Sequence, residues 1–471
     1  MEECAILWDV LQLPVKIVLT NRWEIVNMNK LRLGVTGLSG AGKTIFLMSM
    51  INFLLESGSR HSDLFKKRKL RLSAKKIPVD PDSGLFPYEE YLENFKLGSP
   101  KWPEHTTKLN EFHLVFRLTR EGRKKSKEFK LELADYPGEQ LLDLPLLGKT
   151  YEQWSDETVA YMSKGAKLKI SQQFRQACDK LPKCSGTEFS ARKLIIDEYM
   201  TYLRQCKAKG LTYLQPSMMI LENSDEKNFY NTAFCPLPKN IRLRTQDFTK
   251  KLKKQYAQYK SKHVYDFAKQ IQKCSRQIVL VDVLQILKNG IDSYNDAKYC
   301  LNTILDTYKY RKNYGWLLNL VLKRFPIKIG IDRVSFVATK ADQATRANRH
   351  NMKALLEDLV DKKHDYLLTT AAPARFHFAA SNRCTEDKRK LYEGREISVL
   401  LGRHSQNEAD REKLYYPGEV PSMWPEQWNP QKAAYRFPNF LPKSIPLRDG
   451  ASFDRINLDE ILLHIFGDLV E

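Results

Sequence analysis

Short apolar segments along the chain predict β-strands at residues 31–35, 112–118, 129–133, 278–283, 334–338 and 376–380. Segments 112–118 and 129–133 alternate apolar with polar residues, and the charged linker around Gly122 predicts that they form an antiparallel hairpin. Segment 278–283 is apolar almost throughout, which is typical of a strand that is buried on both faces. Helical segments separate the later strands, so the sequence predicts an α/β fold with a mostly parallel sheet and one antiparallel hairpin.

Helical spacing replaces the strand pattern between residues 141 and 274. Phe248, Leu252, Tyr256 and Tyr259 recur every three or four residues over a lysine-rich background, which predicts an inserted helical subdomain. Residues 59–108 lack clear periodicity and are expected to form a largely irregular loop. The predicted organisation is a first half of the core at 28–140, a helical insertion at 141–274, a second half of the core at 275–400, and a Pro/Trp-rich wrap at 401–471 that ends in a short helix at 458–466.

A glycine-rich turn follows the first predicted strand. It reads Gly37-Leu38-Ser39-Gly40-Ala41-Gly42-Lys43-Thr44 and fits the phosphate-loop pattern G-x-x-x-x-G-K-[ST] without a mismatch. The backbone N–H groups of such a turn converge on phosphates, Lys43 reaches the β- and γ-phosphates, and the Thr44 hydroxyl ligates Mg²⁺. The strand before and the apolar helix after argue against an ordinary turn. Candidate nucleotide contacts here are Ser39, Gly40, Ala41, Gly42, Lys43, Thr44 and Ile45.

Two further segments supply candidate metal and phosphate contacts. Asp135 ends the second hairpin strand and can hold a Mg²⁺-bound water, while Gly138 can offer its N–H to the γ-phosphate. Thr106 precedes the hairpin and is the candidate third metal ligand, with Thr107 as the near alternative and an ordinary loop threonine as the competing interpretation. Trp102, in the same segment, is a further candidate nucleotide contact.

Thr339-Lys340-Ala341-Asp342 ends the strand that begins at Val334 and resembles the guanine-reading pattern [NT]-K-x-D. The Asp342 carboxylate can accept from the N1–H and N2 amine of guanine, a donor pair that adenine lacks, while the Lys340 stem lies along the base. Thr339 stands where Asn is more usual and can bond the phosphate loop through its hydroxyl. The next strand ends in Ala380 and Ser381, whose small side chains let backbone N–H groups approach the guanine O6.

Glu139 and Gln140 follow the D-x-x-G segment, where many GTPases place a Gln that orients the attacking water. A carboxylate at Glu139 is repelled by the γ-phosphate yet can accept a proton from water if its pKa is raised. The candidate catalytic residues are therefore Lys43, Thr106, Glu139 and Gln140, and slow hydrolysis is expected. Gly40 occupies the position where potassium-activated GTPases carry Asn, so no stimulation of hydrolysis by potassium is expected.

The 471-residue chain carries 77 basic and 56 acidic side chains, a net charge of +21, which makes nucleic acid, an anionic membrane surface and phosphorylated ligands candidate partners. Lysines at 164, 167, 169, 250, 251, 253 and 254 place much of this charge on the helical insertion, and a solvated helix face is the competing interpretation. No segment approaches the ~20 apolar residues of a membrane span. The eight cysteines fit no zinc pattern and predict reduced thiols in a cytoplasmic protein.

Taken together, these motifs resemble the YcjX-like family of bacterial P-loop GTPases, whose members are stress-associated. The resemblance rests on VTGLSGAGKT (35–44), WPEHT (102–106), DYPGEQLLDLPLLGKTY (135–151), SRQIVLVDVLQ (275–285), ATKADQ (338–343) and YPGEVPSMWP (416–425). It implies a Ras-like GTPase core with a helical insertion after switch II, the segment at 135–140, and binding of GTP or GDP with Mg²⁺. His105 departs from the Arg that is commoner in the family, and residues 1–27 match poorly, which makes Met28 an alternative start.

The sequence therefore predicts a slow, Mg²⁺-dependent GTPase that acts as a stress-response switch in the cytoplasm. Peripheral attachment to the inner membrane through the basic insertion, and self-association, are further expectations, with nucleic acid less favoured. Two alternatives are an ATP-dependent P-loop enzyme in which T-K-A-D is coincidental, and a nucleotide-stabilised membrane scaffold with little turnover.

Overall fold

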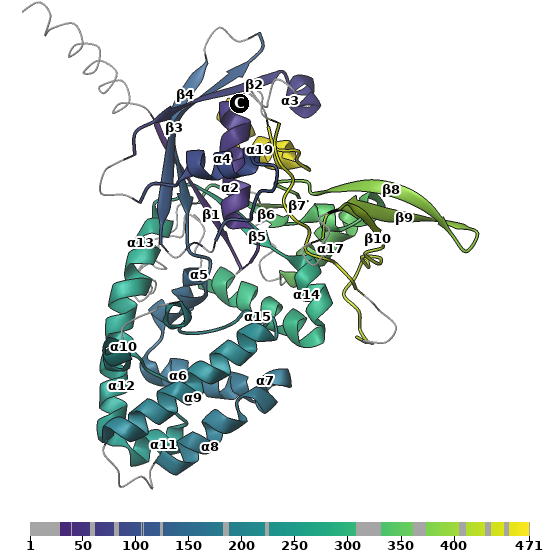
Figure 1. Ribbon diagram of the computed structural model, residues 1–471. Helices are drawn as coiled ribbons and strands as arrows, with labels where there is room; N and C mark the ends of the chain where they lie inside the picture. Colours follow the sequence, from purple (N-terminus) through teal and green to yellow (C-terminus); the bar gives the residue numbers. More distant parts are fainter. Residues whose placement is uncertain are drawn as a thin grey trace, which may run out of the picture.

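A seven-stranded sheet organises the molecule (Figure 1). The computed structural model describes residues 29–38, 40–56, 62–79, 84–104, 106, 108–122, 126–181, 188–221, 226–307, 331–360, 374–404, 411–428, 435–446 and 452–470. The strand order is β2-β3-β4-β1-β5-β6-β7. The strands are β1 (Asn29–Gly37), β2 (Leu70–Ile77), β3 (Asn110–Arg120), β4 (Lys127–Asp135), β5 (Arg276–Val281), β6 (Arg333–Ala338) and β7 (Ala374–Phe378). All pairings from β4 to β7 are parallel, whereas β2, β3 and β4 pair antiparallel, so the predicted fold class is confirmed.

Both faces of the sheet are covered. Leu31, Leu33 and Val35 of β1 lie in one core with the helices α2 (Lys43–Leu55) and α19 (Leu458–Phe466). Val279 and Val281 of β5 lie in the core on the other face. That core also includes residues of α14 (Val283–Asn289), α15 (Ile291–Thr307) and α17 (Arg349–Leu359). Parallel strands covered on two faces read as continuous apolar runs, which is why 278–281 shows no alternation.

A body of helices lies between β4 and β5 in the sequence and below the sheet in Figure 1. Its members are α5 (Gln140–Asp143), α6 (Tyr151–Met162), α7 (Gly165–Ile170), α8 (Gln172–Lys180), α9 (Glu188–Ala208), α10 (Glu226–Thr232), α11 (Lys239–Arg244), α12 (Gln246–Tyr259) and α13 (Asp266–Gln272). A π-helical segment, Lys260–Tyr265, joins α12 to α13. The four aromatic and aliphatic residues predicted for the buried face of α12 are buried, and its lysines at 250, 251, 253 and 254 are exposed.

Three sequence-based expectations are wrong. Residues 59–108 include α3 (Asp63–Lys67), strand β2 and α4 (Tyr88–Lys96) rather than a largely irregular loop. A second sheet, β8 (Thr385–Tyr392), β9 (Arg395–Gly402) and β10 (Lys413–Tyr415), was not predicted, because most residues of β8 are polar and exposed. Lys167, assigned to the basic surface, is buried in an ion pair with Asp296.

Across the described ranges, no helix is both long enough and apolar enough to cross a membrane.

Candidate nucleotide-binding site

The glycine-rich turn joins the end of β1 to the start of α2. Gly40 and Gly42 adopt φ values of 75° and 82°, a region that disfavours residues with a Cβ. A Cβ at either glycine would meet nothing within 4 Å, so their backbone angles, and not crowding, call for glycine. Because α2 has no side-chain cap and no acidic residue in its first turn, its N-terminal N–H groups are available for an anion.

Lys43 and Gly138 lie against each other at this turn. A Cβ on Gly138 would collide with Lys43 Nζ and with the Gly37 carbonyl oxygen, so only glycine fits this approach. Burial lowers the pKa of the Lys43 ammonium, and the carboxylates of Glu139 and Asp135 oppose that shift. A buried cation beside a helix N-terminus is suited to neutralise phosphate charge.

Three oxygen-bearing side chains meet beside Lys43. Thr44 Oγ1 lies 3.0 Å from Thr106 Oγ1, and both hydroxyls donate to Asp135 Oδ2, at 3.4 Å and 3.0 Å. Asp135 Oδ1 is buried and has no hydrogen-bond partner among the described residues. Burial raises the pKa of Asp135 to about 6, against the hydrogen bonds from the two threonines. This hard-oxygen set with an orphaned carboxylate oxygen fits Mg²⁺, which binds few protein oxygens and keeps water and phosphate ligands.

Three residues of the T-K-A-D turn line the same pocket as Lys43 and Thr44. Asp342 is buried, and its Oδ2 accepts a hydrogen bond from the Cys384 N–H at 3.0 Å. Burial raises the pKa of Asp342, and the hydrogen bond from Cys384 opposes that shift. Lys340 has a φ of 59°, and its Nζ lies 2.6 Å from Asp282 Oδ2, whose charge raises the Lys340 pKa. The Thr339 hydroxyl contacts the Val281 carbonyl at 3.5 Å, in place of the expected bond to the phosphate loop.

One pocket of about 580 Å³ brings the predicted segments together. Of the predicted site residues, Gly40, Ala41, Gly42, Lys43, Thr44, Ile45, Trp102, Thr106, Gly138, Glu139, Lys340, Asp342 and Ser381 line it. Asp135 adjoins it through the two threonines. Ser39 and Thr107 lie outside the described residues.

Three predicted residues do not line the pocket. Gln140 begins α5 and is absent from the pocket wall, where its neighbour Glu139 is present. Ala341 is buried behind the wall, with its N–H bonded to the Ala379 carbonyl. The Ala380 N–H donates to the Ile456 carbonyl at 3.2 Å, so it does not point toward a guanine O6.

Sequence reasoning missed several residues that line the pocket or hold its wall. Asp282 follows the buried strand β5 and holds Lys340, but nothing in the sequence marks it as a partner of residue 340. Asn439 and Phe440 come from the Pro/Trp-rich tail, and the Trp102 indole N–H donates to the Phe440 carbonyl at 3.0 Å. Aromatic residues in an otherwise aperiodic tail are the one signal that could have suggested this contact.

Switch II is fastened to the helical body by polar contacts. The Ser217 hydroxyl donates to the Glu139 carbonyl at 2.7 Å and to Asp143 Oδ2 at 2.6 Å, and Asp143 also accepts from the Tyr259 hydroxyl. Burial raises the pKa of Asp143 to about 6, although these hydrogen bonds oppose the shift. Lys207 on α9 lies 4.0 Å from the Glu139 carboxylate.

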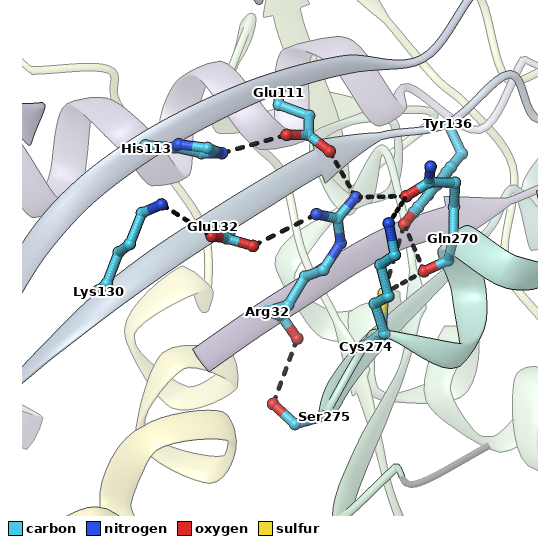
Figure 2. Close-up of polar contacts among 10 residues, drawn as sticks. Arg32, Glu111, His113, Lys130, Glu132, Tyr136, Gln270, Cys274 and Ser275 are labelled. Carbon is cyan, nitrogen blue, oxygen red and sulfur yellow. Dashed lines mark hydrogen bonds and ion pairs between the residues drawn. The ribbon is translucent and has the colours of Figure 1, made fainter. Parts of the chain in front are cut away.

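A second attachment surrounds Tyr136, next to Asp135 (Figure 2). The Tyr136 hydroxyl lies 3.3 Å from the Gln270 carbonyl and 3.4 Å from Cys274 Sγ. Arg32 of β1 donates to Gln270 Oε1 at 3.2 Å, to Glu132 on β4 at 3.3 Å and to Glu111 on β3. The hydrogen bond from His113 and the charge of Arg32 lower the pKa of Glu111 to about 2 against its burial. Three strands, α13 and switch II therefore share one buried polar cluster.

Comparisons with known proteins show the family of this chain. The sequence model of the YcjX-like family, DUF463, matches residues 31–470. The protein from Escherichia coli K12 called Ras-like GTPase YcjX is 30% identical over 457 residues, which cover 93% of this chain and 95% of that protein. A protein of the same description from Shewanella oneidensis is 28% identical, over 94% of this chain and 95% of its own. The predicted family is confirmed: this chain belongs to the YcjX-like family.

Proposed function

We propose that this protein binds GTP and GDP with Mg²⁺ and hydrolyses GTP slowly, as a molecular switch. The observation that carries the proposal is that one pocket is lined both by Lys43, Thr44 and Thr106 and by Lys340 and Asp342. The description of both relatives as Ras-like GTPases supports the choice of nucleotide.

The residues have distinct roles in this proposal. Lys43 and the N–H groups of the turn bind the β- and γ-phosphates, and Gly138 offers its N–H to the γ-phosphate. Thr44, Thr106 and, through water, Asp135 would hold Mg²⁺, which supplies neutralisation of the phosphate charge when bound. Asp342 accepts from the guanine donors, and Asp282 holds Lys340 in place along the base.

Hydrolysis is expected to be slow because the residue after D-x-x-G is a carboxylate. Glu139 lines the pocket near Lys43, so it can reach a water at the γ-phosphate but is repelled by the phosphate charge. We expect an intrinsic rate within about tenfold of the ~10⁻⁴ to 10⁻² s⁻¹ of P-loop switches.

The proposed cellular role, location and lipid contact rest on the family resemblance, the buried thiols and the exposed lysines. The stress-response role rests on the resemblance to the family. We place the protein in the cytoplasm, where the buried thiols of Cys178, Cys206, Cys235, Cys274, Cys300 and Cys384 stay reduced. The exposed lysines of α12 offer a surface to anionic lipid at the inner membrane.

Nucleotide specificity tests the proposal. Calorimetric titration should give tighter binding of GDP than of ADP, and Asp342→Asn should exchange that preference for XDP, because xanthine has an oxygen where guanine has its N2 amine. Lys43→Ala should lower GTP affinity at least tenfold, about 1.4 kcal/mol, with an unchanged circular dichroism spectrum. Equal affinity for GDP and ADP would favour an ATP-dependent enzyme, and an Asp342→Asn variant that keeps its GDP preference would remove that residue from base recognition.

A further inference from the structure

Strand β7 is the last strand of the large sheet, and some of its backbone N–H and C=O groups point to its outer edge, away from β6. The Ala379 N–H donates to the Ala338 carbonyl at 2.8 Å, and the Ala379 carbonyl accepts from the Ala341 N–H at 3.0 Å. Residue 379 therefore points its backbone groups toward β6. Because alternate residues of a strand point their N–H and C=O groups to opposite sides, Phe376 and Phe378 point theirs away from β6.

The same edge already pairs with another segment one step further along. Ala380 and Ile456 exchange two backbone hydrogen bonds, at 3.2 Å and 2.9 Å, in an antiparallel bridge. At Asn457 the chain adopts a φ of 57° and turns away into α19. Within the described ranges, the backbone partners of residues 374–380 are β6, Ala341 and this bridge. The outward groups of Phe376 and Phe378 therefore lie beyond the end of the segment that pairs at Ile456.

A groove of about 410 Å³ follows this edge. Arg346, in the short 3-10 helix Arg346–Asn348 before α17, lines it together with His350 and Lys353 of α17. The three side chains form a basic stripe along the groove. Arg349 also lines it, but its guanidinium is engaged by Asp387 at 2.7 Å and by the Ala341 carbonyl at 2.9 Å. Glu460 is the one carboxylate among the described lining residues.

His377 adds a buried polar group to the groove. Its side chain is 2% exposed and lies 3.8 Å from Glu460 Oε1, and neither ring nitrogen has a hydrogen-bond partner among the described residues. A buried donor or acceptor without a partner is destabilising, so a ligand that brings polar atoms into the groove would recover part of that cost.

We propose that the outer edge of β7 binds an extended, acidic peptide segment of a partner protein by strand addition. The main chain of the peptide pairs with Phe376 and Phe378, and its carboxylates on one face meet the basic stripe of Arg346, His350 and Lys353. A peptide is favoured over a small anion because the two outward residues are spaced by two, which is the repeat of a strand. The Ala380–Ile456 bridge shows that this edge accepts a chain in that geometry.

Position 378 allows a matched test of backbone pairing. Phe378→Ala and Phe378→Pro both remove the ring, but only proline also removes the N–H, and that N–H does not pair with β6. The probes are fluorescent eight-residue peptides in which aspartate or lysine alternates with valine, titrated into the full GDP-loaded chain. We expect the aspartate peptide to bind at least tenfold tighter than the lysine peptide. We also expect Phe378→Pro to weaken it at least tenfold relative to Phe378→Ala.

Charge reversal tests the basic stripe. Arg346→Glu combined with Lys353→Glu should abolish the preference for the aspartate peptide, whereas Lys254→Glu on α12 should leave it unchanged. In the wild-type chain, the peptide should slow amide hydrogen exchange at residues 376 and 378, a readout that remains if the proline variant fails to fold.

Three outcomes would overturn the proposal. One is equal binding of the two peptides, and another is unchanged exchange at residues 376 and 378 in the presence of bound peptide. The third is equal affinity of folded Phe378→Pro and Phe378→Ala variants for the aspartate peptide. A control uses inorganic pyrophosphate and the chain loaded with a non-hydrolysable GTP analogue. If pyrophosphate binds, the charge reversal abolishes that binding, and no strand pairing is seen, then the groove is a small-anion site instead.

Discussion

At the residue scale, Glu139 and Gln140 are adjacent in the sequence but differ in environment. Glu139 is 8% exposed and lines the candidate nucleotide pocket. Burial lowers the pKa of the Lys43 ammonium, and the nearby Glu139 carboxylate opposes that shift. Its carbonyl is fixed by the Ser217 hydroxyl, and Lys207 lies 4.0 Å from its carboxylate. Gln140 is half-buried at the start of α5, outside the pocket wall. We therefore expect Glu139, and not Gln140, to be the residue that reaches the attacking water.

This difference predicts the outcome of single-turnover hydrolysis assays. Glu139→Ala should lower the rate at least tenfold, since a positioned general base contributes about 10²–10⁴-fold, while Gln140→Ala should stay within twofold of the wild type. Rates in sodium and potassium buffers should agree, because Gly40 offers no side-chain ligand to a cation. A larger loss in Gln140→Ala than in Glu139→Ala would reverse the assignment, and a wild-type rate above about 1 s⁻¹ without a partner would contradict slow hydrolysis.

Contiguous motifs could be predicted from the sequence residue by residue, whereas their distant partners could not. Lys43, Thr44, Lys340 and Asp342 occupy fixed positions in short patterns, and the structure places all four in one pocket. Asp282 is 58 residues from Lys340, and only the parallel pairing of β5 with β6 brings them together. The Ala380 N–H was predicted to approach the base, but it points to the outer edge of the sheet and donates to the Ile456 carbonyl. Which residues of a strand point their N–H groups outward depends on the register of the sheet.

At the scale of elements, the short helix α5 is held by one buried carboxylate. Asp143 accepts from the Ser217 N–H at 3.1 Å, from the Ser217 hydroxyl at 2.6 Å and from the Tyr259 hydroxyl of α12. Switch II is in this way tied both to the segment after α9 and to the long helix α12. The carboxylate is fully buried without a cation among these partners, and its pKa in the folded protein is about 6, above its ordinary value of 3.8.

The elevated pKa predicts how stability depends on pH. Below pH 3.8 Asp143 is protonated in both the folded and the unfolded chain, and its contribution is fully present. As pH rises through about 6 the folded protein must give up a proton that it holds more tightly than the unfolded chain, so this stability is lost. The free energy of unfolding of the wild type relative to Asp143→Asn should therefore fall by roughly 2–3 kcal/mol between pH 4 and 7. Urea denaturation at several pH values measures it, with the exposed Asp247→Asn as control; a flat difference would contradict the assignment.

The buried cluster around Arg32 predicts strong coupling between strands. Arg32→Ala leaves Glu111 and Glu132 without their shared cation and should cost about 3–5 kcal/mol of stability, because removing one partner exposes an uncompensated buried charge. The double variant Arg32→Ala, Glu111→Gln should cost less than the sum of the two single changes. Additive losses in a denaturation cycle would show that the two side chains do not interact.

Elements were predictable where burial imposes a pattern. The strands β1 and β3 to β7 and the helix α19 have apolar residues at regular spacing or in a continuous run, and all were predicted. Strand β2 lies at the sheet edge with lysines on its exposed positions, and β8 is a hairpin strand with one buried residue, so neither carries a clear period. Their pairing with neighbouring strands, rather than their own sequence, determines their structure.

At the scale of the whole molecule, the net charge of +21 is distributed unevenly between surface and interior. Lys43 and Lys167 are buried and serve the pocket and an ion pair with Asp296. Lys253 pairs with Glu152 across the surface. The exposed lysines at 250, 251, 253 and 254 lie on the side of α12 away from its buried aromatic residues. Because none of these four lysines lines the pocket, changing their charge should leave the pocket intact.

The α12 face therefore predicts a separable attraction to anionic lipid. Each lysine near such a surface contributes up to about 1 kcal/mol, and the attraction weakens as salt shortens the Debye length. Replacing the lysines at 250, 251, 253 and 254 by Gln should reduce co-sedimentation with phosphatidylserine vesicles several-fold at low salt while GDP affinity is unchanged. Arg346→Gln combined with Lys353→Gln, in and just before α17, is the matched control. The wild type should be released by raising salt. Binding that is absent, or that persists at 1 M salt, would leave the α12 lysines as a solvated helix face.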